Sequence, residues 1–337
     1  MRLSVSTLAS VMAIAVVGAA GGPFTAAHAE DAVLQVFASP MVIDQVNIVN
    51  RLAGVSPIEM TELDSIDALQ KLCDPANGGI PSVAVVVTTI TASISDKCVS
   101  NGIGELLEAS LGFGTMVLAQ KASDPPMSLS SKVLYQALAH DVPDDESFKL
   151  NTANTWSDVD ASLPKLDIRL IVGSLGTAAR KVFEDEAMVG GCRQFDAVQS
   201  IFDAKTRVST CTKFKKGAVL EVDSLDERVA ALRAAAPGAV AVLPINVALK
   251  HKDWMRIIPF DGFLPTPESI NAEDYVLTVP FYVYVRPEDL AKEGPVRLWM
   301  WEILSEEAIG DKGYGKDGGL TELPAATREW QRRSMFK

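Results

Sequence analysis

Short runs of apolar residues alternate along the chain with longer stretches in which apolar positions recur at helical spacing. The runs are rich in β-branched residues, and several are almost wholly apolar, which predicts strands buried on both faces. The predicted strands are residues 33–37, 82–88, 115–119, 168–172, 239–243 and 278–285. The predicted helices, several opened by an Asp or Ser that could cap the first turn, are residues 66–72, 129–140, 178–189, 225–235 and 297–306. This alternation indicates an α/β architecture with mixed or parallel sheets.

A stretch rich in Pro, Asp and Asn interrupts the alternation at residues 141–164. Such residues favour turns and loops, so this stretch is predicted to leave one lobe and enter another. The chain has 337 residues, which is more than one small core needs and suggests two compact lobes.

The N-terminal segment has the pattern of a targeting signal. Arg2 supplies a positive start, residues 5–22 are almost wholly apolar or small, and residues 27–29 (Ala-His-Ala) form a small-x-small cleavage pattern. We therefore expect residues 1–29 to be a cleaved secretory signal peptide. The alternative is a transmembrane anchor, which the interspersed Ser, Thr and Gly disfavour. The mature residues 30–337 contain no comparable apolar segment, so a soluble, exported, periplasmic protein is expected.

Net charge argues against two classes of partner. The chain has 31 Lys and Arg against 43 Asp and Glu, a formal net charge of −12, and no long basic run offsets it locally. Nucleic acid and an anionic membrane surface are therefore not expected as partners, because both require clustered Lys and Arg.

The four cysteines fit an exported protein. Four cysteines permit three pairings. The pairs closest in sequence, Cys73 with Cys98 and Cys192 with Cys211, are favoured. Each would close a loop of about twenty residues, worth on the order of 3 kcal/mol. A zinc site is disfavoured, because the chain has no CxxC motif and neither mature histidine has a cysteine close in sequence.

No motif for catalysis is present. The chain lacks GxSxG, GxxxxGK[ST], HExxH and a GxGxxG that follows a strand. The carboxylate clusters at residues 184–186 and 306–307 fall on predicted helices, where solvated faces explain them. We therefore expect neither an enzyme nor a cofactor nor a bound metal.

One strand-to-helix junction has the chemistry of an anion site. The predicted strand 168–172 leads through Gly-Ser-Leu-Gly-Thr, residues 173–177, into a predicted helix. A helix N-terminus leaves backbone N–H groups free and carries the positive end of the helix dipole. Thr177 could cap this helix and Arg180 lies in its first turn. The alternative is an ordinary capped connection.

A series of spaced segments extends this observation to the whole mature chain. The segments are residues 98–102, 111–113, 134–143, 151–159, 183–192, 279–285, 305–310, 313–314 and 319–320. In order and spacing they resemble the PstS-like periplasmic phosphate-binding proteins of high-affinity phosphate ABC transporters. The resemblance covers residues 33–336. It implies an α/β two-lobe periplasmic binding protein of type II, in which each lobe is a mixed β-sheet flanked by helices and the ligand cleft lies at the hinge.

The resemblance also implies a domain plan and a role. Within the solute-binding domain, residues 30–337, we expect lobe 1 over approximately residues 30–120 plus 240–337 and lobe 2 over approximately residues 121–239. The implied role is capture of phosphate or a related oxyanion for an ABC importer, with a permease in the inner membrane as partner. Proteins of this kind are usually monomers, so a monomer is expected.

The resemblance places the ligand contacts in four loops. The first loop keeps Ser39. The second, counted back from Cys98, falls on residues 87–89 (Val-Thr-Thr), where the family has an arginine. The third falls on residues 112–115, where Gly114 takes the place of an aspartate, and the fourth becomes residues 177–180. The implied ligand-binding residues are Ser39, Thr88, Thr89, Gly114, Thr177 and Arg180.

These two losses weaken the expected grip on phosphate. The family's aspartate accepts a hydrogen bond from a protonated phosphate oxygen, which sulfate cannot donate. A lost arginine removes charge-assisted hydrogen bonds of about 1.5–3 kcal/mol each. Two alternatives therefore stay open. One is a different ligand, whether an organophosphate, another anion or an apolar molecule, and the other is a non-transport periplasmic partner protein that has lost phosphate binding.

Overall fold

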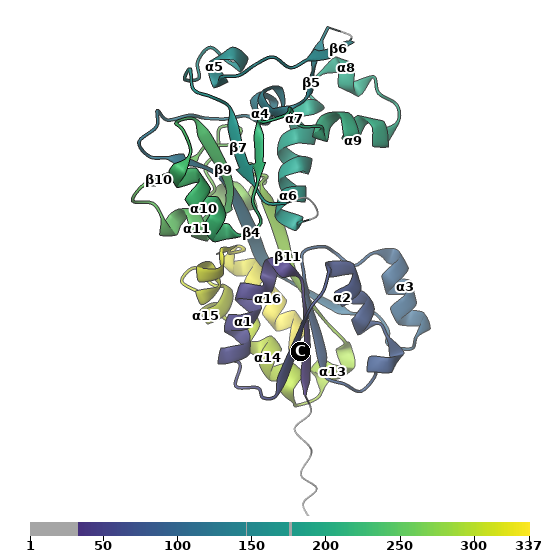
Figure 1. Ribbon diagram of the computed structural model, residues 1–337. Helices are drawn as coiled ribbons and strands as arrows, with labels where there is room; N and C mark the ends of the chain where they lie inside the picture. Colours follow the sequence, from purple (N-terminus) through teal and green to yellow (C-terminus); the bar gives the residue numbers. More distant parts are fainter. Residues whose placement is uncertain (1–32, 146, 175–176) are drawn as a thin grey trace, which may run out of the picture. The chain divides into compact units, whose positions relative to one another are not determined.

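A ten-stranded mixed sheet organises the computed structural model, which describes residues 33–145, 147–174 and 177–337 (Figure 1). The main path of the sheet is β2 (Ile58–Glu62), β1 (Leu34–Ala38), β3 (Ser82–Val86), β11 (Thr278–Val285), β4 (Leu107–Lys121), β9 (Ala239–Pro244), β7 (Arg169–Val172) and β8 (Val219–Glu221). Two more strands, β10 (Met255–Ile258) and β12 (Leu320–Thr321), also pair with β4. The predicted signal peptide, residues 1–29, lies outside the described residues.

Parallel and antiparallel pairing coexist in this sheet. β1 pairs in parallel with β2 and β3, and β7 pairs in parallel with β8 and β9. β4 runs antiparallel to β9, β10 and β11. Each predicted strand forms, and the prediction for residues 278–285 coincides with β11. The mixed α/β class predicted from the sequence is confirmed.

Strand β4 takes part in both ends of the sheet. Residues 107–115 pair with β11, and residues 116–119 pair with β9. Only the second half was predicted, because Gly112 and Gly114 interrupt the apolar pattern of the first. Gly114 is required by packing, since a Cβ there would collide with the ring of Phe281 on β11. A glycine that suggests a loop in the sequence is here a strand position over which the Phe281 ring packs.

Hydrophobic clusters cover both faces of the sheet at the β1, β3 and β11 end. One face packs against α1 (Ile43–Leu52), α13 (Pro287–Ala291), α14 (Pro295–Ile303), α15 (Glu306–Ile309) and α16 (Ala325–Met335). The other packs against α2 (Ser65–Leu72) and α3 (Ala92–Ser100). The predicted disulfide between Cys73 and Cys98 is confirmed and lies in the second cluster, where it joins α2 to α3.

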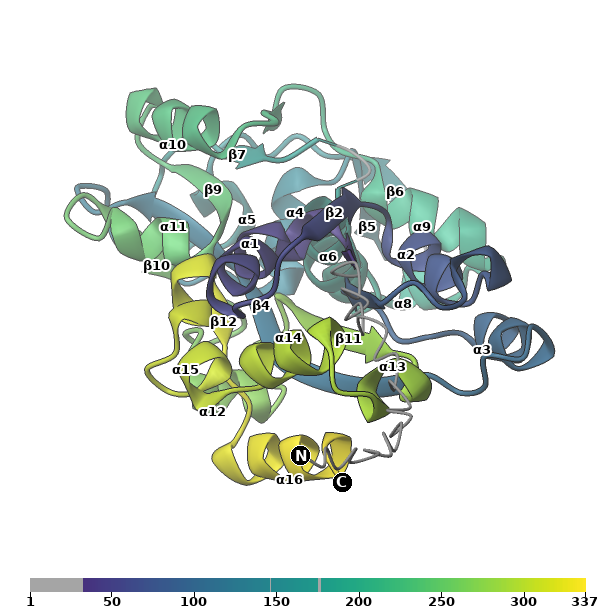
Figure 2. The same cartoon turned by 90° about the horizontal axis from the view of Figure 1, so that it is seen from below.

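Two further clusters cover the β7 and β9 end. One includes α10 (Leu225–Ala234) and α11 (Ile245–Lys250). The other includes α4 (Ser131–Leu138), α5 (Trp156–Val159), α7 (Gly190–Cys192), α8 (Asp196–Gln199), α9 (Ala204–Thr212) and α12 (Pro267–Asn271). Figure 2 shows α10 and α11 on the opposite side of β9 from α8 and α9. Buried members of these two clusters all lie within residues 116–277, whereas those of the first two lie within residues 34–111 and 279–335.

The stretch predicted as a connection, residues 141–164, packs into one of these clusters. It contains the hairpin of β5 (Asp141–Asp144) and β6 (Ser147–Leu150) and the helix α5. Trp156 of α5 is fully buried, and its Nε1 donates a hydrogen bond of 2.9 Å to the Gly238 carbonyl. The chain on either side of the stretch packs into the same cluster. The turn-forming residues therefore belong to a surface hairpin, and the chain does not pass to another cluster there.

The predicted helix over residues 178–189 forms in two pieces. α6 (Ala178–Val182) continues without a break into a π-helical segment, Phe183–Val189. π-helical turns are rare in proteins, and many of those that occur lie at functional sites. None of the helices within the described ranges has both the length and the apolar character needed to cross a bilayer.

Candidate ligand-binding site

A cavity of about 890 Å³ opens beside the carboxyl ends of the parallel strands β1, β2 and β3. Ser39 follows β1, Glu62 ends β2 and Val87 follows β3, and all three line the cavity. In open α/β sheets this edge is where ligands bind. The facing wall comes from α6, α9 and α10, so the lining draws on residues from both ends of the sheet.

The structure brings four of the six predicted ligand residues to this cavity. These four are Ser39, Gly114, Thr177 and Arg180. Thr88 and Thr89 are not among the lining residues, and the turn after β3 contributes Val87 instead. The segment counted back from Cys98 therefore reaches the cavity only through Val87, and the role of the two threonines stays a prediction.

Ser39 lies where β1 passes into a short 3₁₀ turn, Pro40–Val42. Its backbone N–H donates to the Val85 carbonyl at 2.9 Å, which extends the pairing of β1 with β3 by one residue. Its side-chain hydroxyl does not cap the turn. The proline that follows Ser39 starts this turn, where its missing N–H costs nothing.

Thr177 and Arg180 lie together at the start of α6. Thr177 caps the helix, since its Oγ1 accepts a hydrogen bond from the Arg180 backbone N–H at 3.3 Å. The Arg180 side chain is 2% exposed, and its Nε donates to Glu184 Oε1 at 2.7 Å. Its Nη1 lies 3.3 Å from Glu221 Oε1, and its guanidinium stacks over the ring of Phe214 at 4.8 Å. Two carboxylates therefore already compensate the arginine that the resemblance implied for the ligand.

Carboxylates are prominent among the lining residues that the sequence did not assign to a ligand site. They are Asp44, Glu62, Asp64, Glu184 and Asp185. Asp185 forms an ion pair of 2.5 Å with Lys181, another lining residue. Glu62 ends β2, and Asp64 lies two residues beyond it. The strand prediction rested on apolar runs, and β2 has only Ile58 and Met60 between polar residues, so the place of these carboxylates at a strand end was not predicted.

Arg228 of α10 is a further lining residue that the sequence did not reveal. It falls on a predicted helix, and a basic side chain on a helix is ordinarily solvated. In the folded protein its side chain is only 7% exposed. Burial lowers the pKa of its guanidinium, and the nearby Asp223 charge partly opposes this shift.

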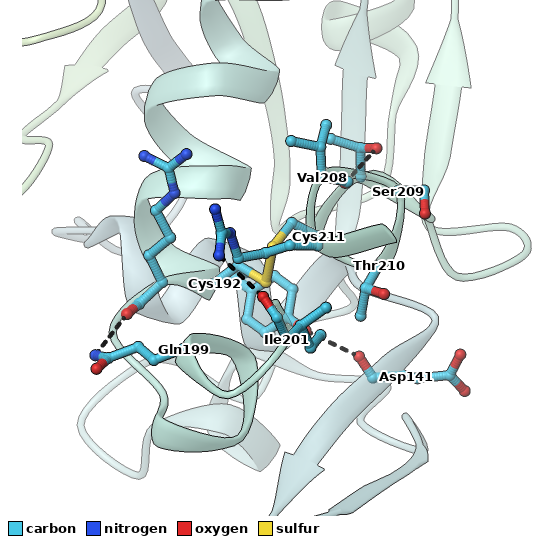
Figure 3. The surroundings of a disulfide bond; sticks show 12 residues. Asp141, Cys192, Gln199, Ile201, Val208, Ser209, Thr210 and Cys211 are labelled. Carbon is cyan, nitrogen blue, oxygen red and sulfur yellow. Dashed lines mark hydrogen bonds between the residues drawn. A yellow bond between two sulfur atoms is a disulfide. The ribbon is translucent and has the colours of Figure 1, made fainter. Parts of the chain in front are cut away.

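Helix α9 forms another part of the wall through Val208 and Thr212. The predicted disulfide between Cys192 and Cys211 is confirmed and joins α9 to α7 (Figure 3). Cys211 lies next to Thr212 in sequence and one helical turn after Val208. The disulfide therefore fixes this part of the cavity wall to the buried core around Cys192.

Acidic side chains near the cavity do not assemble into a metal centre. Across residues 33–145, 147–174 and 177–337, no three His, Cys, Asp or Glu side chains cluster in a way that could hold a metal ion. Burial, together with the neighbouring Asp185 charge, raises the pKa of Glu186 on the π-helical segment. The charged groups that face the cavity can therefore act through hydrogen bonds and ion pairs to a ligand.

A family comparison identifies the class of protein to which this geometry belongs. The model of the PBP superfamily domain matches residues 29–307. The chain belongs to the PBP superfamily. No curated protein matches the chain.

Solved structures similar to this PBP superfamily member share its fold at low sequence identity. A possible phosphate binding protein from Planctomyces limnophilus is 14% identical, with a TM-score of 0.62 over 90% of this chain and 98% of that chain. PstS from Borrelia burgdorferi is 14% identical, with a TM-score of 0.55 over 87% and 100%. An ABC-type phosphate transport receptor from Vibrio cholerae is 15% identical, with a TM-score of 0.56 over 86% and 100%. The predicted type II binding-protein fold is confirmed.

Proposed function

We propose that this PBP superfamily member is a PstS-like solute-binding protein that captures phosphate or a related oxyanion for an ABC importer. One observation carries the proposal: Ser39, Gly114, Thr177 and Arg180, which come from three segments far apart in the sequence, line a single cavity. Similar folds in a possible phosphate binding protein and in an ABC-type phosphate transport receptor support it. In this role the protein binds its ligand without transforming it.

The proposal includes export and a membrane partner. Residues 1–29 would direct the chain to the periplasm and be removed there. The loaded protein would then deliver its ligand to an inner-membrane permease. Support comes from the signal pattern in the sequence and from the family to which the chain belongs.

The proposal also includes two lobes that close on the ligand. We place the second lobe at residues 116–277, because the buried members of two hydrophobic clusters fall within this range. The chain would then pass between the two lobes twice, at residues 115–116 in β4 and at residues 277–278 before β11. These two crossings would form the hinge. The Met116 N–H donates to the Leu277 carbonyl at 2.8 Å, so these crossings lie side by side. Rotation about a few residues of this kind is typical of hinge closure.

Isothermal titration of the exported, ligand-stripped protein with inorganic phosphate tests the function, with sulfate as the control anion. We expect phosphate to bind with a micromolar or lower dissociation constant. No heat at millimolar phosphate would exclude a phosphate receptor.

A second candidate ligand is a larger organic molecule that bears an oxyanion group. The lining carboxylates outnumber the lining Arg and Lys side chains, and about 890 Å³ exceeds the space that one tetrahedral oxyanion needs. Carboxylates on the β2 side could accept hydrogen bonds from hydroxyl or amino groups of such a ligand. Native mass spectrometry of the purified protein would detect a bound organic molecule by its added mass.

A further inference from the structure

Arg228 differs from the other buried arginines among the described residues. Those with less than a tenth of their surface exposed are Arg180, Arg228, Arg286 and Arg328. Arg180 pairs with Glu184 and Glu221, Arg286 with Asp289, and Arg328 with Glu306 and Asp311. Within the described ranges no carboxylate lies within 4.0 Å of an Arg228 nitrogen, so its charge is not compensated by an ion pair.

The contacts that Arg228 does make are few and neutral. Its Nη1 donates to the Val242 carbonyl at 3.2 Å, and its Nη2 donates to the Asp223 carbonyl at 3.3 Å. Its Nε is buried and has no hydrogen-bond partner in the described part of the chain. A buried cation that has no ion-pair partner within 4.0 Å is costly, and the charge of Asp223, which lies farther away, offsets only part of this cost. An anion that enters the cavity would offset this cost, because Arg228 is one of the lining residues.

Arg228 lies beside Gly173 and Thr177, the two ends of the strand-to-helix junction that the sequence analysis identified as a possible anion site. A Cβ built on Gly173 would lie 3.6 Å from Cζ and Nη1 of Arg228 and 3.5 Å from Thr177 Oγ1. The guanidinium and the threonine hydroxyl therefore both flank Gly173, the residue that follows β7. Thr177 and Arg228 both line the cavity, so a hydroxyl and a cation lie close together in its wall.

We propose that Arg228 supplies the positive charge that binds the oxyanion group of the ligand. The inference rests on the proposed solute-binding function and identifies the charged contact of that site. Arg180, with two carboxylates, would then contribute mainly to the shape of the wall around Thr177. A planar guanidinium is well suited to an oxyanion because it donates two parallel hydrogen bonds.

Titrations of three variants test the proposal with inorganic phosphate, sulfate and glycerol 3-phosphate as probes. Arg228→Gln removes the charge, and Arg228→Lys keeps the charge but loses the planar donor pair. Arg233→Gln is the matched control, because Arg233 lies on the same helix, is exposed, and does not line the cavity. We expect Arg228→Gln to weaken binding of the bound probe at least tenfold, Arg228→Lys to weaken it less, and Arg233→Gln to stay within about twofold of the wild type.

Folding is measured in the same variants without ligand, by near-ultraviolet circular dichroism and urea unfolding. If Arg228→Gln does not fold, the Arg228→Lys titration decides the question, since unchanged affinity in that variant would contradict a bidentate contact. Affinity within twofold of the wild type in a folded Arg228→Gln variant would overturn the proposal.

The probes separate failure of this proposal from failure of the proposed function. Phosphate binding that survives Arg228→Gln would reject the Arg228 contact and keep the phosphate receptor. Binding of glycerol 3-phosphate alone, lost in Arg228→Gln, would reject capture of inorganic phosphate and keep the Arg228 contact. Absence of binding for all three probes in the wild-type protein would overturn both.

Discussion

At the scale of single residues, charge pairing inside the protein determines what the cavity offers to a ligand. The sequence placed Thr177 and Arg180 correctly at the start of a helix, because capping patterns are local. It could not show that Glu221, from the separate strand β8, lies 3.3 Å from Arg180 Nη1. Nor could it show that, among the described residues, no carboxylate lies within 4.0 Å of an Arg228 nitrogen, because a missing contact depends on the whole fold. Sequence patterns therefore located Thr177 and Arg180, but neither Arg228 nor the ion pairs that compensate Arg180.

Replacing Glu184 by Gln should raise the affinity for inorganic phosphate by about threefold to tenfold. Glu184 lines the cavity and pairs with Arg180 Nε at 2.7 Å. The change removes one negative charge from the cavity and leaves more of the Arg180 charge for an anion. Isothermal titration against the wild-type protein measures the effect.

The control for this change is Glu329→Gln on α16. Glu329 pairs with the exposed Arg333 and does not line the cavity. It removes the same formal charge, so an equal gain in both variants would show that net charge, and not the Arg180 pair, is responsible. A lower affinity in Glu184→Gln would contradict the prediction outright.

At the scale of elements, the sequence predicted buried strands and missed exposed ones. The strands that were predicted are buried on both faces, as β3 and β9 are over nearly their whole length. β2 and β8 were not predicted, because exposed positions dominate them and β8 has only three residues. α9 carries one fully buried side chain, Cys211, so its place depends on the disulfide more than on an apolar face.

Removal of the disulfide that holds α9 should affect both stability and binding. The double variant Cys192→Ala and Cys211→Ala should lower the free energy of unfolding by about 3 kcal/mol. It should also weaken phosphate binding several-fold, because Val208 and Thr212 would no longer be held at the cavity wall. Urea unfolding and isothermal titration provide the two measurements.

The other disulfide provides a matched control. Cys73 follows the C-terminal end of α2, whereas the cavity residue Ser65 lies at its N-terminal end. The double variant Cys73→Ala and Cys98→Ala should therefore lose comparable stability with affinity within about twofold of the wild type. Equal losses of affinity in both double variants would contradict a specific role for α9.

At the scale of the whole molecule, the buried residues form groups whose boundaries can be set beside the lobes that the resemblance implied. The resemblance implied a second lobe over approximately residues 121–239, and the buried members of two clusters lie within residues 116–277. The sequence could not show that β10 belongs to this group, because a short apolar run does not indicate with which strand it will pair. The α/β class, by contrast, follows from the alternation of strands and helices, whereas the type II binding-protein fold was expected only from the resemblance.

We expect an isolated fragment of residues 116–277 to fold on its own with the bond between Cys192 and Cys211 formed. The fragment contains the buried members of two clusters, one on each face of its sheet. Residues 33–115 alone should not fold, because β11 would be missing between β3 and β4. Cooperative urea unfolding and dispersed amide resonances identify a folded fragment. A non-cooperative transition for residues 116–277 would contradict the expectation.

The position of β11 between β3 and β4 also sets an order of events during biosynthesis. β3 and β4 emerge early from a ribosome or a translocon, but the strand that joins them ends only at residue 285. All five residues of β3 are buried in the finished sheet, and the edge of β3 that pairs with β11 has no partner while the intervening chain emerges. The end of the sheet that contains β1, β2 and β3 is therefore synthesised first but joined to β4 last, when β11 is made. Chaperones that bind extended segments can act on this unpaired edge until β11 is made, and destabilising changes in β11 would leave it unpaired for longer.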